Sequence, residues 1–324
     1  SSFSKEAFDS YTYFHYVKSL SDLDFISLYN RMLSTNYLIS SPYGSIIIHT
    51  LLFKIIGSSS FIVSEYIFVA LFFIIFFLIF RTIGLSKNLS LLVSVILFVS
   101  PIILKDFNYF GITELKTFFG LIYGLRFPRP LVVNIYFYFF IYILLQSHLN
   151  KNFFSIKNLS IFSILLALTA SSFFFFFINM FLTLFIYLLV EYKNKFFHKL
   201  KENILKIIYS IILFSILITP FVILMMNSNP DYMQRMGVYE LDFDNKIFLI
   251  NHYLSKILRL KLIFFYIFLI LSFFLIKKFN NENLKYIKIF YILFFSSLLS
   301  PIMFILCSGK TAFLMHFNNM VVLS

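Results

Sequence analysis

The chain has 324 residues, of which 60% are hydrophobic and 13% are charged, and its formal net charge at pH 7 is +13. Soluble domains average about 45–50% apolar and about 25% charged residues, so no water-soluble fold could bury this much apolar surface. The composition therefore excludes a soluble globular protein, and we expect an all-α, polytopic transmembrane helical bundle.

The chain begins with residues 1–60, which we place outside the membrane as one loop. Within it, residues 44–57 (GSIIIHTLLFKIIG) are apolar but short, and they contain His49 and Lys54. We expect a helix that lies in the outer interface or dips into it. The alternative is a short true span, which would leave residues 1–42 inside with three basic and four acidic residues. That balance is not typical of a cytoplasmic segment.

About eight spans are predicted, since a helix needs about 20 mainly apolar residues to cross the hydrocarbon. Residues 159–190 are too long for one span, and the small residues 170–172 (ASS) offer a tight turn between two shorter helices. The sequence begins without methionine and ends inside an apolar stretch, 312–324, so we expect it to be truncated at both ends. The predicted spans are 61–80, 89–104, 130–146, 158–170, 173–190, 204–226, 262–276 and 286–307.

Lysine and arginine set the orientation of these helices. If residues 191–203 (EYKNKFFHKLKEN) are cytoplasmic, the inside loops are 81–88, 147–157, 191–206 and 277–288. These loops hold 13 basic and three acidic residues, whereas the outer remainder holds 14 basic and 11 acidic residues. Short cytoplasmic loops are rich in basic residues, so this bias supports the assignment. We expect one multipass domain over 1–324, with outer loops at 1–60 and 227–260, in a bacterial inner (plasma) membrane.

Two arginines stand at the outer membrane surface in residues 120–134 (GLIYGLRFPRPLVVN). Arg126 and Arg129 lie on the side that the insertion rule disfavours, and Lys116 shares their loop. The anionic partner expected at this depth is a phosphate of a lipid or a lipid-linked substrate, because the planar guanidinium group suits phosphate oxygens. The alternative is that both arginines reach ordinary headgroups, or pair with Asp106 or Glu114.

Acidic residues in the outer loops are the second group of interest. Asp9 has helical spacing to Tyr13 and Tyr16, and a carboxylate among aromatic side chains at the membrane surface could act as a general base. The alternative is an ordinary helix start, where a negative charge is stabilising. Asp242 and Asp244 could hold a divalent cation through oxygen ligands, or could serve only loop solubility.

Cysteine and histidine usage bounds the metal chemistry. The one cysteine, Cys307, excludes a disulfide within the chain, and the six histidines show no HxxxH or HxH spacing. We therefore predict no structural metal site.

The order of features over about residues 1–190 is distinctive. An acidic, tyrosine-containing helix from Asp9 to Leu20 precedes PYGSIIIHTLLFKIIG (42–57). A long span that ends in arginine (61–81) and a second span that ends in Ser-Pro (91–101) follow. This order resembles the amino-terminal module of GT-C glycosyltransferases, multipass enzymes that use polyprenyl-phosphate or polyprenyl-diphosphate sugars.

The resemblance implies a role for each candidate residue. Asp9 takes the place of the catalytic acid in the first outer loop, and Asp106 or Glu114 that of a second acid. Arg126 and Arg129 become candidates for the donor's phosphate, with Lys116, His15 and Lys54 as further substrate contacts. The resemblance also implies a lipid-linked sugar donor as co-substrate, surrounding membrane lipids, a glycan, lipid or protein acceptor, and no nucleic acid. It leaves a divalent cation open.

We therefore expect an integral-membrane glycosyltransferase that moves a sugar from a polyprenyl-phosphate-linked donor to an acceptor on the outer, periplasmic face. A polymerase of lipid-linked saccharides is one alternative, and its large late loop would correspond to 227–260. A transporter or flippase is another. Transporters tend to keep ionisable residues at mid-membrane and broken helices in repeated halves, whereas the predicted spans here are almost free of charge at their centres.

Overall fold

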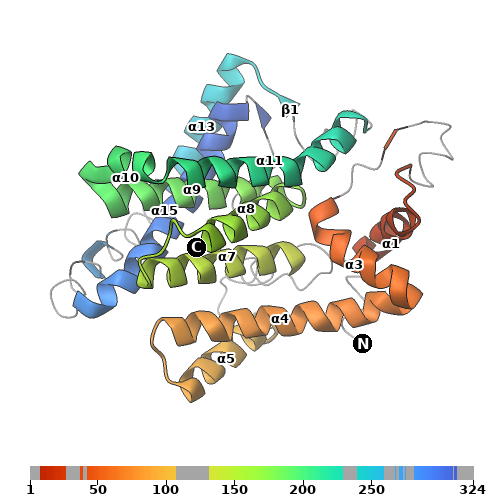
Figure 1. The fold of residues 1–324 in the computed structure, drawn as a ribbon, viewed down its shortest axis with the longest axis horizontal. Helices are drawn as coiled ribbons and strands as arrows, with labels where there is room; N and C mark the ends of the chain where they lie inside the picture. Colours follow the sequence, from red (N-terminus) through yellow and green to blue (C-terminus); the bar gives the residue numbers. More distant parts are fainter. Residues whose placement is uncertain are drawn as a thin grey trace. The chain divides into compact units, whose positions relative to one another are not determined.

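A computed structural model of the chain describes residues 8–26, 37–38, 42–106, 131–228, 239–258, 281–308 and 310–311, with isolated positions at 267, 270–272 and 274. Apart from two strands of two residues each, the regular structure in these ranges is helical, as the composition predicted (Figure 1). Internal contacts divide the chain into two compact units, Ser1–Phe177 with Glu202–Tyr232, and Ile178–Lys201 with Met233–Ser324. The boundary falls inside helix α9.

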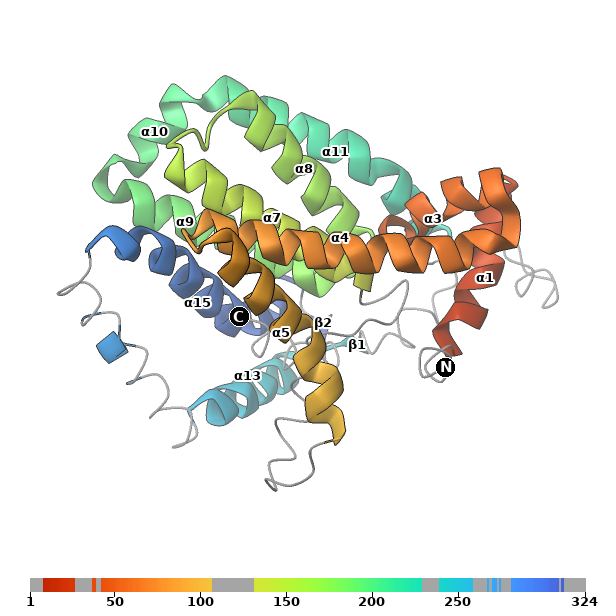
Figure 2. The ribbon, with the colours of Figure 1, turned by 90° about the horizontal axis from the view of Figure 1, so that it is seen from below.

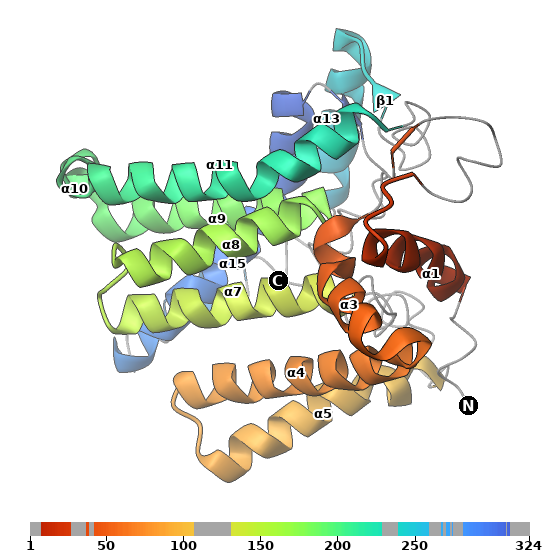
Figure 3. The ribbon, with the colours of Figure 1, turned by 45° about the vertical axis from the view of Figure 1, so that its right-hand side comes forward.

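The first unit holds most of the helices. In chain order they are α1 (Phe8–Ser21), α3 (Tyr43–Ile56), the 3-10 turn η2 (Gly57–Ser59), α4 (Ser60–Thr82), α5 (Lys87–Asp106), α7 (Leu131–Leu149), α8 (Ile156–Ala170), the first residues of α9 (Phe174–Tyr192) and α11 (Ile204–Met226). Helices α4, α7, α8 and α11 lie alongside one another, while α1 and α3 lie at one end of them (Figures 2 and 3).

Helices occupy the predicted spans wherever the structure describes them, and most of 262–276 lies outside the described residues. Five helical stretches among the described residues are long and apolar enough to cross a membrane: Tyr43–Thr82, Leu131–Leu149, Phe174–Glu202, Ile204–Met226 and Tyr286–Ser308. Ile156–Ala170 is apolar but shorter. The chain is therefore consistent with a multipass helical membrane protein.

The predicted turn between 158–170 and 173–190 is confirmed. Helix α8 ends at Ala170 and α9 begins at Phe174. The hydroxyl groups of Ser171 and Ser172 donate to the carbonyl oxygens of Ala167 at 2.9 Å and Leu168 at 2.6 Å. The Ala167 carbonyl also accepts from the Ser171 N–H at 3.0 Å, whereas the Leu168 carbonyl takes its printed bonds from hydroxyl groups, so small hydroxyl residues suit this turn.

Side-chain contacts show that two pairs of neighbouring helices in the first unit, α4 with α7 and α8 with α11, are parallel. The end of α4 meets the end of α7, where Gln146 Nε2 donates to Thr82 Oγ1 at 2.9 Å. Helices α8 and α11 run in the same direction, since Ser163 and Ser210 share a hydroxyl hydrogen bond of 2.7 Å and Ser160 and Tyr209 one of 3.2 Å. We call the end at Thr82 and Gln146 the Thr82 end of the unit, and the opposite end the Gly44 end.

Helix α7 forms the core of the first unit. It is buried along most of its length, and α4 and α8 pack against it. Tyr138 of α7 contacts the rings of Phe72 and Phe76 in α4, with centroids 5.6 and 4.6 Å apart. Such tilted and edge-to-face ring pairs are favourable geometries for aromatic contacts. Helix α11 contains no buried residue, so its apolar surface suits contact with lipid.

In the second unit, α9 packs antiparallel to α15 (Asn281–Ser308) through polar contacts. Asn179 Nδ2 donates to Ser297 Oγ at 2.7 Å, and Thr183 and Ser296 share a hydroxyl bond of 2.6 Å. Eight residues farther along both helices, Lys288 Nζ donates to a carboxylate oxygen of Glu191. Polar side chains that bond across helices hold such pairs together in membranes.

The remaining elements of the second unit follow the end of α9 or surround the end of α15. They are η4 (Lys193–Lys195), α10 (Phe196–Glu202, whose last residue belongs to the first unit), β1 (Tyr239–Glu240), α13 (Phe243–Ile257) and β2 (Lys310–Thr311). Strand β1 pairs antiparallel with β2, so the start of α13 lies at the end of α15. Asp242 caps α13, because its carboxylate accepts from the Asn245 N–H at 2.9 Å.

Candidate functional site

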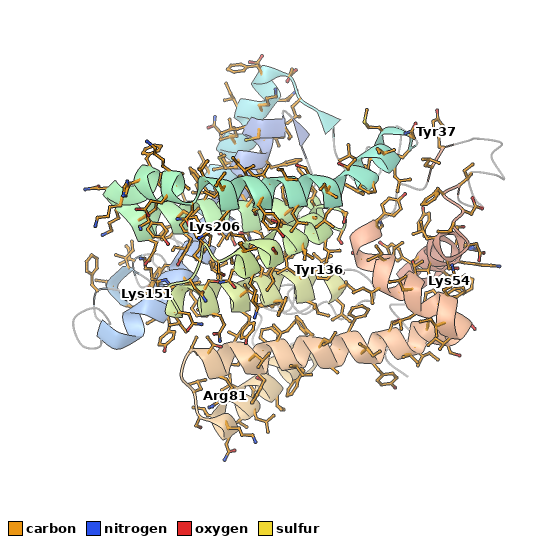
Figure 4. All side chains as sticks on the ribbon, in the orientation of Figure 1. Tyr37, Lys54, Arg81, Tyr136, Lys151 and Lys206 are labelled. Atoms are coloured by element: carbon orange, nitrogen blue, oxygen red, sulfur yellow. The ribbon has the colours of Figure 1, made fainter. Side chains whose placement is uncertain are left out.

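Asp9, the acid predicted to lie in the first outer loop, belongs to a helix, as its spacing predicted. Asp9 lies in the first turn of α1, but its side chain is outside the described residues. His15 stands in the middle of the same helix and is exposed. Lys54 stands in the last turn of α3 and is also exposed (Figure 4).

The other candidates belong to the connection between α5 and α7. Asp106 is the last residue of α5, and its side chain is outside the described residues. Glu114, Lys116, Arg126 and Arg129 also lie outside them. Their proposed contacts therefore stay predictions.

Helix α1 is attached to α3 by an apolar cluster. Tyr13 and Val17 of α1 and Ile46 of α3 are buried together. Phe14 extends this contact, with ring centroids 6.0 Å from Phe53 and 5.2 Å from Phe61. The aromatic spacing that suggested a site beside Asp9 therefore serves, at Tyr13 and Phe14, to pack α1 on α3.

Both ends of α3 lie at the Gly44 end of the first unit. In its first turn, the Gly44 carbonyl accepts from the Tyr136 hydroxyl at 2.7 Å, and the Gly44 N–H approaches the Ser171 carbonyl at 3.4 Å. Its last turn leads through η2 into the start of α4. Helix α3 therefore does not run from one end of the unit to the other, as α4 and α7 do.

Glycine is required at position 44 by close packing. A Cβ atom there would overlap the carbonyl oxygen of Leu168 and the hydroxyl oxygens of Ser171 and Ser172. The ring of the preceding residue, Tyr43, packs against Phe221 of α11 with centroids 5.9 Å apart. The start of α3 is thus held by α7, α8 and α11 together.

Polar residues are buried along one face of α3, at Ser45 and His49, and along one face of α4, at Ser60 and Ser64. His49 Nε2 and Ser60 Oγ share a hydrogen bond of 3.2 Å. The imidazole ring also packs edge-on against Phe61, with centroids 3.9 Å apart. Sequence reasoning did not single out these buried polar residues. The signal was the four-residue spacing within the pairs 45/49 and 60/64, which places each pair on one helix face.

Basic residues mark the opposite end of the first unit. Figure 4 shows Arg81, Lys151 and Lys206 toward the Thr82 end, and Lys54 with Tyr37 toward the Gly44 end. Arg81 belongs to the last turn of α4, and Lys151 follows α7 directly. The loops predicted to be inside thus gather at one end wherever the first unit describes them, as the rule for cytoplasmic loops expects.

In the described part of the chain, no three or more His, Cys, Asp or Glu residues lie together in a cluster that could hold a metal ion. Asp242, half of the predicted Asp-Phe-Asp cation motif, instead caps α13. A helix cap is a sufficient structural role for that carboxylate.

No protein-family model, curated protein or solved structure matches this chain.

Proposed function

We propose that this chain is an integral-membrane glycosyltransferase of the GT-C type. It transfers a sugar from a polyprenyl-phosphate-linked donor to an acceptor at the outer face of the membrane. Because cytoplasmic loops are rich in basic residues and the basic loops gather at the Thr82 end, the Gly44 end faces outward in this proposal.

The observation that carries the proposal is what gathers at the Gly44 end. Helix α1, which contains Asp9, packs on α3 there. Helix α7 begins there with Leu131, beyond the Tyr136–Gly44 bond, and α5 leads back from its turn at Gly84 toward the same end (Figure 3). The segment that contains both arginines starts after the end of α5 at Asp106 and ends before the start of α7 at Leu131. Because α5 leads toward the Gly44 end and α7 begins there, this supports placing Arg126 and Arg129 on the same side as Asp9.

Helix α3 supports the same picture. A helix with both ends on one side, and with exposed apolar residues such as Ile47, Leu51 and Ile55, suits the membrane interface. In this proposal α3 lies along the outer surface and carries α1 with it. Asp9 is then held at headgroup depth, where the phosphate of a polyprenyl donor lies.

The chemistry needs a carboxylate and cations. In the proposed reaction, the acceptor oxygen or nitrogen attacks the anomeric carbon while Asp9 takes its proton. The bond from that carbon to the phosphate oxygen breaks, and the polyprenyl phosphate leaves with the electron pair. Arg126 and Arg129 stabilise the negative charge that develops on this leaving group.

The decisive experiment compares Asp9→Asn with Asp22→Asn. The probes are synthetic polyprenyl-phosphate sugars with a radiolabelled sugar, and product formation is followed in membranes that contain the protein. We expect Asp9→Asn to abolish transfer while the protein still inserts, and Asp22→Asn, an exposed acid after the end of α1, to keep it. Full transfer by Asp9→Asn would remove Asp9 from the mechanism.

A further inference from the structure

The connection between α9 and α11 carries a cluster of lysines. Residues 193–201 (KNKFFHKLK) contain four lysines and no aspartate or glutamate, and we call them the α10 basic segment. Three of these lysines are exposed: Lys193, Lys195 and Lys201. Glu191, two residues before the segment, is already paired with Lys288 of α15, and Glu202 directly follows the segment. The α10 basic segment therefore carries more positive charge than the carboxylates beside it balance.

The α10 basic segment lies between two candidate membrane spans. Helices α9 and α11, on either side of it, belong to stretches that are long and apolar enough to cross a membrane. Only residues 193–203 separate the two helices in the chain. A segment this short cannot cross the bilayer again, because a spanning helix needs about 20 residues. The α10 basic segment is therefore at the membrane surface where α9 ends.

The ring of Phe196, the first residue of α10, shows how close the segment comes to the lipid. It packs edge-to-face against Phe185 of α9, with centroids 6.3 Å apart. Phe181, Phe185 and Leu189 follow one another at one-turn spacing and are all exposed, so this face of the spanning helix suits contact with lipid. Helix α10 therefore begins beside the lipid-facing side of α9.

The next residue, Phe197, points away from this contact and is 81% exposed. Lys201 stands one turn later in α10 and is also exposed, so the aromatic ring and the ammonium group share one face of the helix. A helix that combines exposed apolar side chains with lysines binds at a membrane surface: the apolar side chains enter the boundary of the acyl chains, and the cations attract anionic lipids.

We propose that the α10 basic segment binds the headgroups of anionic phospholipids in the leaflet beside it. Phe197 inserts between the lipids, and Lys193, Lys195 and Lys201 contact their phosphate groups. Charge decides the class of lipid, since a cluster of lysines without acids attracts a surface with net negative charge more strongly than a zwitterionic one. This interaction is independent of the proposed transferase activity.

Tryptophan fluorescence of the full chain tests the proposal, because the chain contains no tryptophan of its own. The Phe197→Trp variant is reconstituted in vesicles of phosphatidylcholine and phosphatidylglycerol. Either the zwitterionic or the anionic lipid carries bromine atoms on its acyl chains, and bromine quenches a fluorophore that it touches. At equal mole fraction and low salt, we expect a roughly fivefold preference for quenching by the brominated anionic lipid, which falls as salt is added.

Two further variants show whether the lysines cause this preference. Phe181→Trp places the fluorophore on the lipid-facing side of α9, 16 positions before Phe197, and should be quenched equally by the two lipids. In the Phe197→Trp background, Lys193→Gln/Lys195→Gln/Lys201→Gln should abolish the preference for the anionic lipid while quenching by both lipids remains.

The matched control removes the same charge elsewhere: Lys87→Gln/Lys151→Gln/Lys157→Gln changes three exposed lysines outside the segment and should keep the preference. The same preference in the Phe197→Trp and Phe181→Trp variants would overturn the proposal, as would equal effects of the two triple variants. Quenching by aqueous acrylamide alone would place α10 in solvent, and protection from acrylamide and both lipids would show that protein covers it. Each of these two results would also overturn the proposal.

Discussion

The hydroxyl group of Tyr136 donates a hydrogen bond of 2.7 Å to the carbonyl oxygen of Gly44, 92 positions earlier in the chain. Both residues are buried, one in the core helix α7 and the other in the first turn of α3. This bond, together with the close contact of Gly44 with the α8–α9 turn, fixes where α3 begins. The position of α1, and with it that of Asp9, depends on this attachment because α1 packs on α3.

Tyr136→Phe removes the hydroxyl group and leaves the Gly44 carbonyl without that donor. We expect the free energy of unfolding to fall by about 1 kcal/mol, the typical contribution of such a bond. The measurement is equilibrium unfolding in mixed micelles. Tyr209→Phe is the control, because its hydroxyl bonds to Ser160 at the exposed surface and its loss should matter less. Equal effects of the two variants would show that the Tyr136 bond does not anchor α3.

Gly44→Ala tests the close packing of α3 against the α8–α9 turn. The added methyl group would overlap the Leu168 carbonyl oxygen, which the backbone of α8 holds in place. Gly57→Ala is the matched control: Gly57 has φ +62°, but a Cβ atom there meets open space. We expect Gly57→Ala to cost about 1–3 kcal/mol from its backbone conformation, φ 62° and ψ −145°, and Gly44→Ala to cost more. A smaller loss of stability for Gly44→Ala would contradict the tight contact.

Asn179→Ala tests the polar contact between α9 and α15 in the second unit. Asn179 donates to Ser297 and accepts from Ser296 at 3.0 Å, so its loss leaves two buried hydroxyl groups with fewer partners. We expect a loss of about 0.6–1.7 kcal/mol of stability, the range of such bonds in membranes. Thr219→Ala serves as the control, since Thr219 is exposed and bonds only to Ser215 in its own helix. If both variants unfold alike, the contact does not hold the two helices.

The arginine pair is tested by the binding of a phosphate-containing probe, which is measured as a rise in the melting temperature of the protein. With farnesyl phosphate as the probe, we expect the wild-type chain to melt at a higher temperature, and farnesol, which lacks the phosphate, to have a smaller effect. Arg126→Ala/Arg129→Ala should lose the difference between the two probes, because the guanidinium groups provide the phosphate contact. Lys151→Ala/Lys206→Ala, at the Thr82 end, should keep it. The same phosphate-dependent shift in both double variants would leave the arginines as ordinary headgroup contacts.

Hydropathy predicted the helices well because a membrane imposes the same requirement on every span. The turn at 170–172 was also predictable, since small hydroxyl residues interrupted an apolar run that was too long for one helix. The joints between helices were not. The Tyr136–Gly44 bond and the contacts of Asn179 join positions far apart in sequence, and no local pattern pairs them.

The candidate site was predictable to a smaller extent. Helical spacing correctly placed Asp9 on a helix, but the aromatic residues that follow it pack α1 on α3. The pattern could not show that His49 and Ser60 bond across the joint, because that requires α4 to fold back against α3. The arginine pair, Lys116 and Glu114 lie outside the described residues, so their roles rest on charge and position alone.

Cysteine labelling in intact cells tests the central claim, that Asp9 and the arginine pair face the same compartment. In a Cys307→Ser background, Asp22→Cys reports on the end of α1, Pro128→Cys on the arginine segment, and Lys151→Cys on the Thr82 end. We expect a membrane-impermeant maleimide to label positions 22 and 128 from outside, and position 151 only after the membrane is opened. Labelling of 22 and 128 from opposite compartments would contradict the account, because the carboxylate and the guanidinium groups could then not act on one substrate.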